Sequence, residues 1–504
     1  MIPFHLLPMH EPVFVLLRSG AGWQADGECN VRCGNRSSAE SLPHLPSAQW
    51  SFDGHTLTLR SDRHGLVPLY YYHSEESFGV SSSWVALQQR LALRELDDAA
   101  IACYLRLGHY LGEDTAFRDL RRMPPNARLT WCNGQMRLSE TAISPPATAQ
   151  IDRERAAVKY GRLFEDAVVQ ICSESRLPRI SLVSGGQDSR HILLSMLAGG
   201  FRPELCLTQA PVVRGDADDA AIAERLCATL DLHCEVVSSG VVSIAVEAAK
   251  NWRIGLESAY HSWLMPLAET LDRLPRGLIF DGLGGDALSA SRFLTDEWIA
   301  AFNAGLIRQA ACVYLAAEGH LPGLLNSEVV RRWPRELAAD RLEAELRRVA
   351  DWPNPQSVFQ LRHRTRRAIA ISLWPLFARG HDVALPYLHP QVFDFLASLP
   401  KEMLVNREFH RAAIEAHYPV SKTIPFAVVG GNTSTKARHW LSPQAIATLK
   451  LAGDHGLKRF VRPNYLRVRA ARAALMPSYV SELESVWSIG IYLAQLGILI
   501  ENQE

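Results

Sequence analysis

The chain has 504 residues, enough for two or three domains. Its 53 basic and 53 acidic side chains give a formal net charge of zero, and 47% of its residues are hydrophobic. This composition excludes a disordered or collagen-like chain, and it excludes binding of nucleic acid through bulk positive charge. Nine scattered cysteines, an odd number, do not form the pattern of a secreted disulfide framework.

The sequence predicts neither secretion nor membrane insertion. Residues 1–17 contain three prolines and no basic cluster, so they make a poor signal peptide. The longest apolar stretch, residues 487–500, is shorter than the ~20 residues that a membrane span needs, and it is better explained as a buried or docking helix. We therefore expect a cytoplasmic protein with no integral membrane segment and no nucleic-acid partner.

The first part of the chain is predicted to consist mostly of short strands, because apolar, β-branched and aromatic residues alternate between glycine turns. The predicted strands are residues 12–17, 55–62, 68–73 and 127–132. A helical pattern covers residues 97–112, and the Pro/Ala/Thr-rich segment 144–150 indicates a linker.

Beyond the linker, helical patterns alternate with short apolar runs. The predicted helices are residues 152–174, 188–200 and 218–230, and the predicted strands are residues 178–186 and 205–210. This alternation is typical of a doubly wound parallel sheet. Helical patterns dominate from about residue 290 to the end.

Two glycine-rich loops carry most of the chemical information. In the first, an apolar run ends at Ser184-Gly185-Gly186, and a helix begins near Asp188 and Ser189. Glycines at such a junction let backbone N–H groups approach an anion, and the helix N-terminus adds its positive dipole end. Both serines can donate to phosphate oxygens, whereas Asp188 is suited to holding Mg²⁺ against a phosphate. The alternative is a tight structural turn with an acidic first helical turn.

The second loop repeats this arrangement about 100 residues later. An apolar strand runs into Asp281-Gly282-Leu283-Gly284-Gly285 and ends at Asp286. Open α/β sheets bind ligands at the carboxyl ends of their strands. Asp188 and Asp286 are therefore predicted to lie around one metal–phosphate group.

The motif S-G-G-x-D-S followed by G-x-G-G-D resembles the synthetase domain of the asparagine synthetase family, whose pyrophosphate loop is that of the adenine-nucleotide α-hydrolases. Residues 61–87 and 112–131 resemble the family's glutaminase half. Residues 384–400 resemble a later family segment, although His389 stands where the family usually has Asp. The resemblance is weak over the last 70 residues.

This resemblance implies a fold in two parts. Residues 1–145 would form a degenerate glutamine amidotransferase-like domain, an Ntn-hydrolase-like α+β sandwich. Residues 151–504 would form an ATP-pyrophosphatase-type domain around a doubly wound parallel sheet, with a helical C-terminal part.

The resemblance also implies ATP and Mg²⁺ as cofactors, with Asp188 and Asp286 as metal ligands and catalytic residues. A cation that stabilises the growing phosphate charge is assigned to Lys422, with Lys436 and Arg411 as rivals, although an ordinary surface side chain is an equal alternative for each. The residues implied to bind ATP or pyrophosphate are Leu182, Val183, Ser184, Gly185, Gly186, Asp188, Ser189, Thr208, Gly282, Gly284 and Gly285.

Three departures from the family narrow the predicted reaction. The family's glutaminase uses a cysteine at position 2 as nucleophile, whereas this chain has Ile2 and its first cysteine is Cys29. We therefore expect no release of ammonia from glutamine and a retained scaffold in its place. Leu283 and Ala287 stand where asparagine synthetases commonly carry Glu, and β-lactam synthetases carry Tyr at the first of these positions.

Among relatives without these groups, the chain most resembles the lasso peptide cyclases, which join an Asp or Glu side chain of a precursor peptide to its N-terminal amine. Such an amine, with a pKa of about 7.7–8.0, is a competent nucleophile near neutral pH. The implied partners are the precursor peptide and a companion leader-processing protease. An ammonia-dependent ligase acting on another acid and a non-catalytic nucleotide-binding scaffold are the alternatives.

Two further groups of residues have ambiguous patterns. The basic run at residues 362–367 could line a groove for an acidic peptide or a phosphate, but a solvated helix face is the favoured interpretation. Trp252, His261 and Trp263 could wall a substrate pocket, and core packing is an equal alternative.

Overall fold

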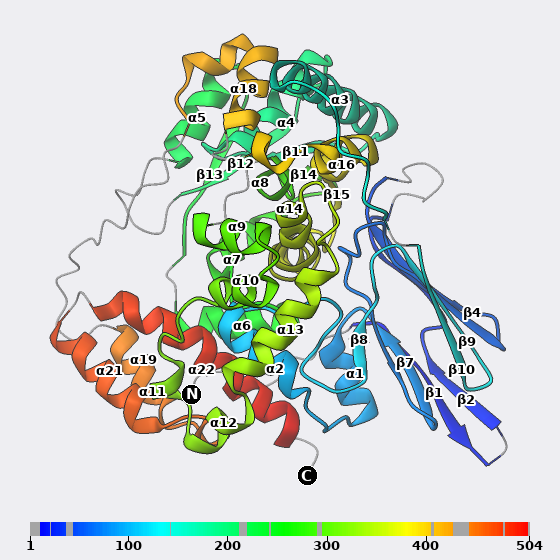
Figure 1. Cartoon of the computed structure of the whole chain (residues 1–504), viewed down its shortest axis with the longest axis vertical. Helices are drawn as coiled ribbons and strands as arrows, with labels where there is room; N and C mark the ends of the chain where they lie inside the picture. The colour runs from blue at the N-terminus through cyan, green and yellow to red at the C-terminus, as the bar shows by residue number, and fades with distance from the viewer. Residues whose placement is uncertain are drawn as a thin grey trace.

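The computed structural model describes residues 11–20, 22–36, 44–141, 143–210, 219–240, 243–289, 295–404, 408–426, 443–476 and 479–501. These residues form three five-stranded sheets. Two antiparallel sheets make up the N-terminal part, and helices surround the third, parallel sheet and extend to the C-terminus (Figure 1). The structure therefore confirms the predicted parallel sheet and the helical C-terminal part.

The two antiparallel sheets, with α1 (Trp84–Leu91) and α2 (Asp98–Leu107), form what we call the N-terminal sandwich. One sheet has the order β2-β1-β7-β6-β8, and the other has the order β10-β9-β5-β4-β3. Their bounds are β1 Val13–Ser19, β2 Gly22–Gly27, β3 Asn30–Gly34, β4 Ser47–Phe52, β5 Thr56–Arg60, β6 Tyr70–His73, β7 Ser77–Ser81, β8 Leu120–Arg122, β9 Ala127–Cys132 and β10 Gln135–Glu140.

Alternating burial explains how the sandwich is held together. Ala127, Leu129 and Trp131 of β9 are buried, whereas the residues between them are more exposed. Because side chains alternate between the two faces of a strand, this pattern places one apolar face of the sheet inward. All four predicted strands of this region are present, and the predicted helix corresponds to α2, which ends at Gly108 with φ 72°.

The parallel sheet has the order β13-β12-β11-β14-β15, and every neighbouring pair runs parallel. Its strands are β11 Arg179–Leu182, β12 Leu205–Gln209, β13 Cys234–Val237, β14 Leu278–Phe280 and β15 Asp382–Ala384. The chain passes from β11 to one edge of the sheet and returns with β14 on the other side of β11. The strand order therefore reverses between β11 and β14, which is where open α/β sheets bind their ligands.

Helices around this sheet follow the predicted pattern. Asp152 caps α3 (Arg153–Glu174) by accepting from the N–H of Arg155 at 2.9 Å. The predicted helices at 188–200 and 218–230 correspond to α4 (Gln187–Ala198) and α5 (Asp219–Thr229). The helices that follow are α6 Ile244–Arg253, α7 Met265–Leu271, α8 Gly285–Ser289, α9 Asp296–Asn303, α10 Ile307–Tyr314, α11 Leu321–Leu324, α12 Ser327–Arg332, α13 Arg335–Arg347, α14 Pro355–Gln360, α15 Ala370–Ser372, α16 Pro390–Ser398, α17 Lys401–Leu404, α18 Glu408–His417, α19 Pro443–Leu451, α20 His455–Lys458, α21 Pro463–Leu475 and α22 Val480–Glu501.

Short helices of other types complete the fold. Within the described residues, the 3₁₀ helices are η1 Ser262–Leu264, η4 Pro386–Leu388 and η6 Pro419–Thr423. Two π-helices, η2 (Leu361–Ile369) and η3 (Leu373–Phe377), lie close together in the chain. π-Helical turns are rare and occur frequently at functional sites.

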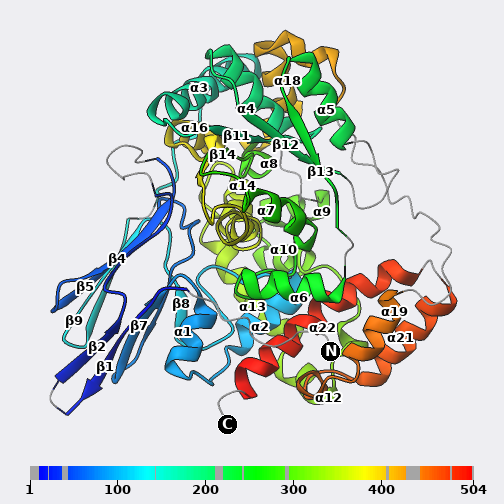
Figure 2. The ribbon, with the colours of Figure 1, turned by 180° about the vertical axis from the view of Figure 1, so that it is seen from behind.

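Helix α22 packs against both the N-terminal sandwich and α6, as Figure 2 shows from behind. The hydroxyl groups of Tyr492 and Tyr110 are 2.7 Å apart, and the ring of Tyr492 stacks on Tyr104 at 3.8 Å between centroids. Gln495 accepts a hydrogen bond from Asn251 of α6 at 2.9 Å. The predicted docking of residues 487–500 is therefore confirmed. Within the described residues, no helix has the length and apolar character that crossing a bilayer requires.

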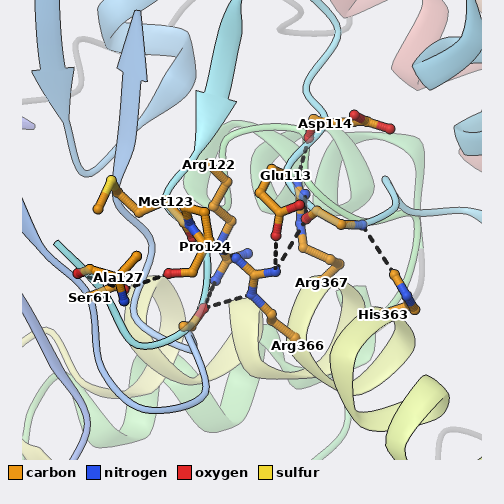
Figure 3. Close-up of polar contacts among 12 residues, drawn as sticks. Ser61, Glu113, Asp114, Arg122, Met123, Pro124, Ala127, His363, Arg366 and Arg367 are labelled. Atoms are coloured by element: carbon orange, nitrogen blue, oxygen red, sulfur yellow. Dashed lines mark hydrogen bonds and ion pairs between the residues drawn. The ribbon is translucent and has the colours of Figure 1, made fainter. Parts of the chain in front are cut away.

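A buried charge network joins η2 to the N-terminal sandwich (Figure 3). Arg366 donates to the carbonyl oxygens of Gly65 at 3.0 Å and Met123 at 2.7 Å. Arg367 pairs with the buried Glu257 at 2.8 Å and donates to the carbonyl of Gly112 at 2.5 Å. The favoured interpretation of residues 362–367 as a solvated face is therefore wrong, because Arg366 and Arg367 are 2% and 0% exposed and satisfied inside the molecule.

This network predicts a large effect of removing one buried charge. Changing Glu257→Gln leaves Arg367 without its counter-charge, and we expect the free energy of unfolding to fall by about 3–5 kcal/mol. The control is Glu95→Gln, which breaks an exposed pair with Arg118 and should cost at most about 1 kcal/mol. Urea unfolding measures both variants, and equal losses would contradict the conclusion that the buried pair of Glu257 and Arg367 contributes more to stability than an exposed pair does.

Candidate functional site

The two glycine-rich loops leave adjacent strands at the same edge of the parallel sheet. Ser181 of β11 lies opposite Phe280 of β14, so the residues after each strand begin side by side. The N–H of Val183 donates to the carbonyl of Leu207 in β12 at 2.8 Å, which extends the sheet to the start of the first loop. The structure thus brings the two loops together at the point where the strand order reverses.

Asp188, at the start of α4, packs directly on the second loop. A Cβ added to Gly282 would lie 2.9 Å from the Cβ of Asp188, and one added to Gly285 would lie 2.7 Å from its carboxylate oxygen Oδ1. Real Cβ atoms do not approach other atoms this closely, so a side chain at either position would force Asp188 to shift. Gly284 has φ 92°, in the left-handed region that favours glycine.

Side chains from distant segments surround Asp188. Nε2 of the buried His410, on α18, lies 3.0 Å from Oδ1 of Asp188. The hydroxyl of Tyr387, on η4, donates to the backbone carbonyl of Asp188 at 3.2 Å. The hydroxyl of Tyr160, on α3, lies 3.1 Å from Nδ1 of His410. These contacts hold Asp188 on the side that faces the protein, and 22% of its side chain remains exposed.

Three carboxylates, those of Asp188, Asp281 and Asp286, lie close enough to affect one another. The pKa of Asp281 is raised to about 6, chiefly by burial and also by the charges of Asp188 and Asp286, while the hydrogen bond from the N–H of Leu283 opposes the shift. The concentration of negative charge attracts a cation. Nη1 of Arg364, on η2, lies 3.9 Å from Oδ2 of Asp286.

The described residues contain no group of three or more His, Cys, Asp or Glu side chains arranged to hold a metal ion. Asp188 and Asp286 nevertheless fit Mg²⁺, which is commonly held by one or two carboxylates together with water and substrate phosphates. Their side chains are partly exposed, 22% for Asp188 and 27% for Asp286, which leaves room for such ligands.

The backbone N–H groups of the first loop have acceptors from the chain itself. The N–H of Ser184 donates to Oγ of Ser189 at 2.9 Å, and that of Gly186 donates to Oγ of Ser184 at 3.2 Å. The N–H of Gly185 donates to a carboxylate oxygen of Asp219, on α5, at 2.9 Å. A carboxylate oxygen of Asp219 thus accepts a hydrogen bond that the sequence analysis predicted for a phosphate oxygen. No side chain caps the N-terminus of α4, so its first-turn amides suit an anion.

The remaining predicted site residues have fewer contacts with the two glycine-rich loops. Thr208 is buried near the carboxyl end of β12, beside β11, and Leu182 is the last residue of β11. Lys422 is exposed on η6, and in the part of the chain described here no hydrogen bond or ion pair joins it to either loop. Arg411 pairs with Glu415 at 2.7 Å on the surface of α18. Lys436 lies outside the described residues.

Sequence reasoning missed four residues around the loops: Arg364, His410, Tyr387 and Asp219. Arg364 belongs to the basic run that was interpreted as a solvated face, and Tyr387 belongs to the segment resembling the asparagine synthetase family. Asp219 lies in an acidic stretch just beyond the predicted helix start. Nothing in the local sequence marks His410, because its role depends on α18 packing against α3 and α4.

Of the aromatic residues with ambiguous patterns, one tryptophan packs in the core and another lines a cavity. Trp252 is 1% exposed in the core, whereas Trp263 is 47% exposed and lines a cavity of about 350 Å³ beside α6. His261 contacts Oγ of Ser372 through Nδ1 at 3.0 Å. His389 packs against His44 at 5.2 Å between ring centroids, so the residue that replaces the family's Asp contacts the N-terminal region.

A second cavity, of about 360 Å³, lies between the N-terminal sandwich and η3, and Cys33 lines it. Burial, reinforced by the charge of Glu11, raises the pKa of Cys33 to about 12. A protonated thiol is a poor nucleophile, so the surroundings of Cys33 do not favour nucleophilic chemistry. Ile2, where that cysteine would stand, lies outside the described residues.

Residues 47–141, which span β4 to β10 of the N-terminal sandwich, match the family model of the glutamine amidotransferase domain. This match confirms the predicted resemblance of the N-terminal region to an amidotransferase domain. The glutamine phosphoribosylpyrophosphate amidotransferase from B. subtilis, solved with ADP and GMP, aligns at 10% identity and a TM-score of 0.16. That alignment covers 54% of this chain and spans 59% of the amidotransferase. A comparison with curated proteins finds no match.

The packing of Asp188 on the second loop predicts the effect of a single added methyl group. Changing Gly285→Ala places a Cβ 2.7 Å from Oδ1 of Asp188, and we expect a loss of about 1–3 kcal/mol of unfolding free energy through overpacking. Gly380→Ala is the control, because an added Cβ there meets nothing within 4 Å. Thermal unfolding compares the two, and equal midpoints would show that Asp188 does not pack on Gly285.

The shifted pKa of Cys33 predicts its reactivity. A thiolate forms only as the pH approaches the raised pKa of about 12, so at pH 8 Cys33 stays protonated and unreactive. Cys29 is exposed and serves as the internal reference. Iodoacetamide labelling at pH 8, followed by peptide mass spectrometry, should modify Cys29 well before Cys33. Equal rates of labelling would contradict this account.

Proposed function

We propose that the chain is an ATP-dependent ligase that joins a carboxylate to an amine and releases AMP and pyrophosphate. The observation that carries the proposal is the packing of Asp188 against Gly282 and Gly285, which unites two glycine-rich loops where the strand order reverses. The N-terminus of α4 at the same loop, which no side chain caps, supports phosphate binding. The amidotransferase-type segment at residues 47–141 supports the family whose synthetase loops these resemble.

In the proposed reaction, a carboxylate oxygen of the substrate bonds to the α-phosphorus of ATP. The bond from that phosphorus to the bridging oxygen breaks, and pyrophosphate leaves with the electron pair. The substrate amine then attacks the acyl carbon, AMP departs, and the amine proton passes to solvent. Asp188 and Asp286 would hold Mg²⁺, which supplies positive charge to the departing pyrophosphate. The backbone N–H groups of Gly185 and Gly186, which now donate to Asp219 and Ser184, would instead donate to phosphate oxygens.

The substrate that we propose is a precursor peptide cyclised as in lasso peptides, through a side-chain carboxylate and the N-terminal amine. Leu283, which is buried in the second loop, supplies no base at the position where related synthetases carry one. An N-terminal amine with a pKa of about 7.7–8.0 needs less help from a base than a weakly nucleophilic nitrogen does. A companion protease that exposes this amine would be the partner.

Replacing either proposed metal ligand tests the function. We expect Asp188→Asn and Asp286→Asn to lower AMP formation by about 100-fold or more, because each removes a charge that holds Mg²⁺ at the leaving group. Asp351→Asn, at an exposed position, is the matched control and should keep wild-type activity. The assay combines Mg-ATP with a leader-free core peptide or, separately, with aspartate and ammonium, and it measures AMP and product masses.

The products distinguish the possible outcomes. A peptide that has lost one water, formed together with AMP, supports macrolactam formation. An amide formed from ammonium would assign an ammonia-dependent ligase instead. Nucleotide that binds in calorimetry without AMP formation in either mixture would indicate a non-catalytic scaffold. Wild-type turnover by Asp188→Asn would overturn the assignment of the site.

A further inference from the structure

The charge network between η2 and the N-terminal sandwich extends into the candidate site through one residue. Arg364 lies on η2 only two residues before Arg366, yet its Nη1 faces Asp286 of the second loop at 3.9 Å. Helix η2 also contacts α8, which begins in that loop. A positive charge on η2 therefore lies beside the carboxylate proposed to hold the metal.

The position of η2 is fixed from the opposite side by loops of the N-terminal sandwich at residues 65 and 112–114. His363 accepts a hydrogen bond from the N–H of Gly112 at 3.1 Å, and Arg367 donates to the carbonyl of Asp114 at 2.8 Å. Arg366 reaches Glu113 at 3.0 Å and the carbonyl of Gly65 at 3.0 Å (Figure 3). These buried contacts hold η2 in one rotational setting, which keeps Arg364 directed toward the second loop.

The loop that receives Arg366 is itself ordered by one carboxylate. Asp62 accepts from the N–H groups of His64, Leu66 and Val67 at 2.9–3.1 Å. This arrangement aims the carbonyl oxygens of Gly65 and Leu66 at arginines, including Arg122, whose Nη2 donates to both. The N-terminal sandwich thus contributes a preorganised set of acceptors for η2.

Arg364 has the chemistry of a phosphate ligand. Nη1 of Arg364 and Oδ2 of Asp286 are 3.9 Å apart, so the two opposite charges attract each other. A guanidinium presents donors in a planar fork that matches phosphate oxygens, and 28% of the Arg364 side chain is exposed. The exposed Lys422 has no comparable relation to the loops in the described structure.

We propose that Arg364 binds the β- and γ-phosphates of ATP beside Asp286 and stabilises the departing pyrophosphate, and that the N-terminal sandwich holds it in place through η2. This inference rests on the proposed ligase function. It gives the amidotransferase-type region a task in the reaction that requires no glutaminase nucleophile. When the α-phosphorus bond breaks, the guanidinium lies beside the oxygen atoms that gain negative charge.

Binding of Mg-pyrophosphate and of AMP, measured separately by calorimetry, tests the role of Arg364. We expect Arg364→Ala to weaken pyrophosphate binding about tenfold or more, Arg364→Lys to weaken it less, and both to leave AMP binding within about twofold. Arg362→Ala is the matched control, because Arg362 lies on the same helix but stacks over Trp352 at 5.4 Å. It should bind both ligands as the wild type does.

Two results would overturn the role of Arg364. Unchanged pyrophosphate binding by Arg364→Ala would remove it from the site, and equal weakening of pyrophosphate and AMP would reveal a general structural role. A failure of the proposed function itself is distinguishable, because the wild-type protein would then bind neither pyrophosphate nor a non-hydrolysable ATP analogue.

The contribution of the N-terminal sandwich to the position of Arg364 is tested by a substitution outside the parallel-sheet region. In Gly65→Ala, an added Cβ would lie 3.0 Å from Nε of Arg366 and would displace its guanidinium. Gly54→Ala is the control, since Gly54 also has a positive φ, 98°, but an added Cβ there meets nothing within 4 Å. We expect only Gly65→Ala to weaken pyrophosphate binding, by about threefold or more. Equal pyrophosphate affinity in the two variants would overturn this part of the proposal.

Discussion

The close approach of the Asp188 carboxylate to the backbone of the second loop is the constraint on which the candidate site depends. It leaves no space for a Cβ at positions 282 and 285 unless Asp188 shifts, and it requires β11 and β14 to be neighbours although nearly 100 residues separate them in the chain. His410 and Tyr387 hold Asp188 from the other side. The carboxylate is therefore fixed between three segments while part of it remains exposed toward solvent.

A second set of constraints joins the two halves of the molecule. Arg122, Arg366 and Arg367 are buried, and the backbone carbonyls of residues 65, 66, 112, 114 and 123 accept much of their hydrogen bonding. Buried charges are tolerated only when paired and hydrogen-bonded, so this arrangement specifies one relative placement of η2 and the N-terminal sandwich. Helix α22 adds contacts to both halves. An amidotransferase-type region without the expected nucleophile is thus built into the same framework as the loops.

Local sequence patterns were sufficient to predict the elements and the two loops. The alternation of apolar and polar residues predicted β9 with its observed bounds. The succession of an apolar run, glycines and a helical pattern predicted β11 and α4. These features depend on residues close together in the chain. The parallel sheet was also predicted from the alternation of elements, because parallel strands need helical crossovers.

Interactions between distant segments were not predictable in this way. The order of the strands, the pairing of Arg364 with Asp286 and the hydrogen bond from Gly185 to Asp219 arise only once the chain has folded. The favoured interpretation of residues 362–367 was wrong because their composition matches that of a solvated helix face. Its π-helical geometry and its buried acceptors on another part of the molecule left no periodic signal in the sequence.

Diffraction can locate directly the one position at which we expect the metal. Crystals grown with Mn²⁺ and α,β-methylene-ATP would give an anomalous signal from the metal. The account predicts a peak bound jointly by Asp188 and Asp286, with the nucleotide phosphates at the N-terminus of α4. A metal bound elsewhere, or a nucleotide bound away from both loops, would contradict the central claim that the two loops form one nucleotide site.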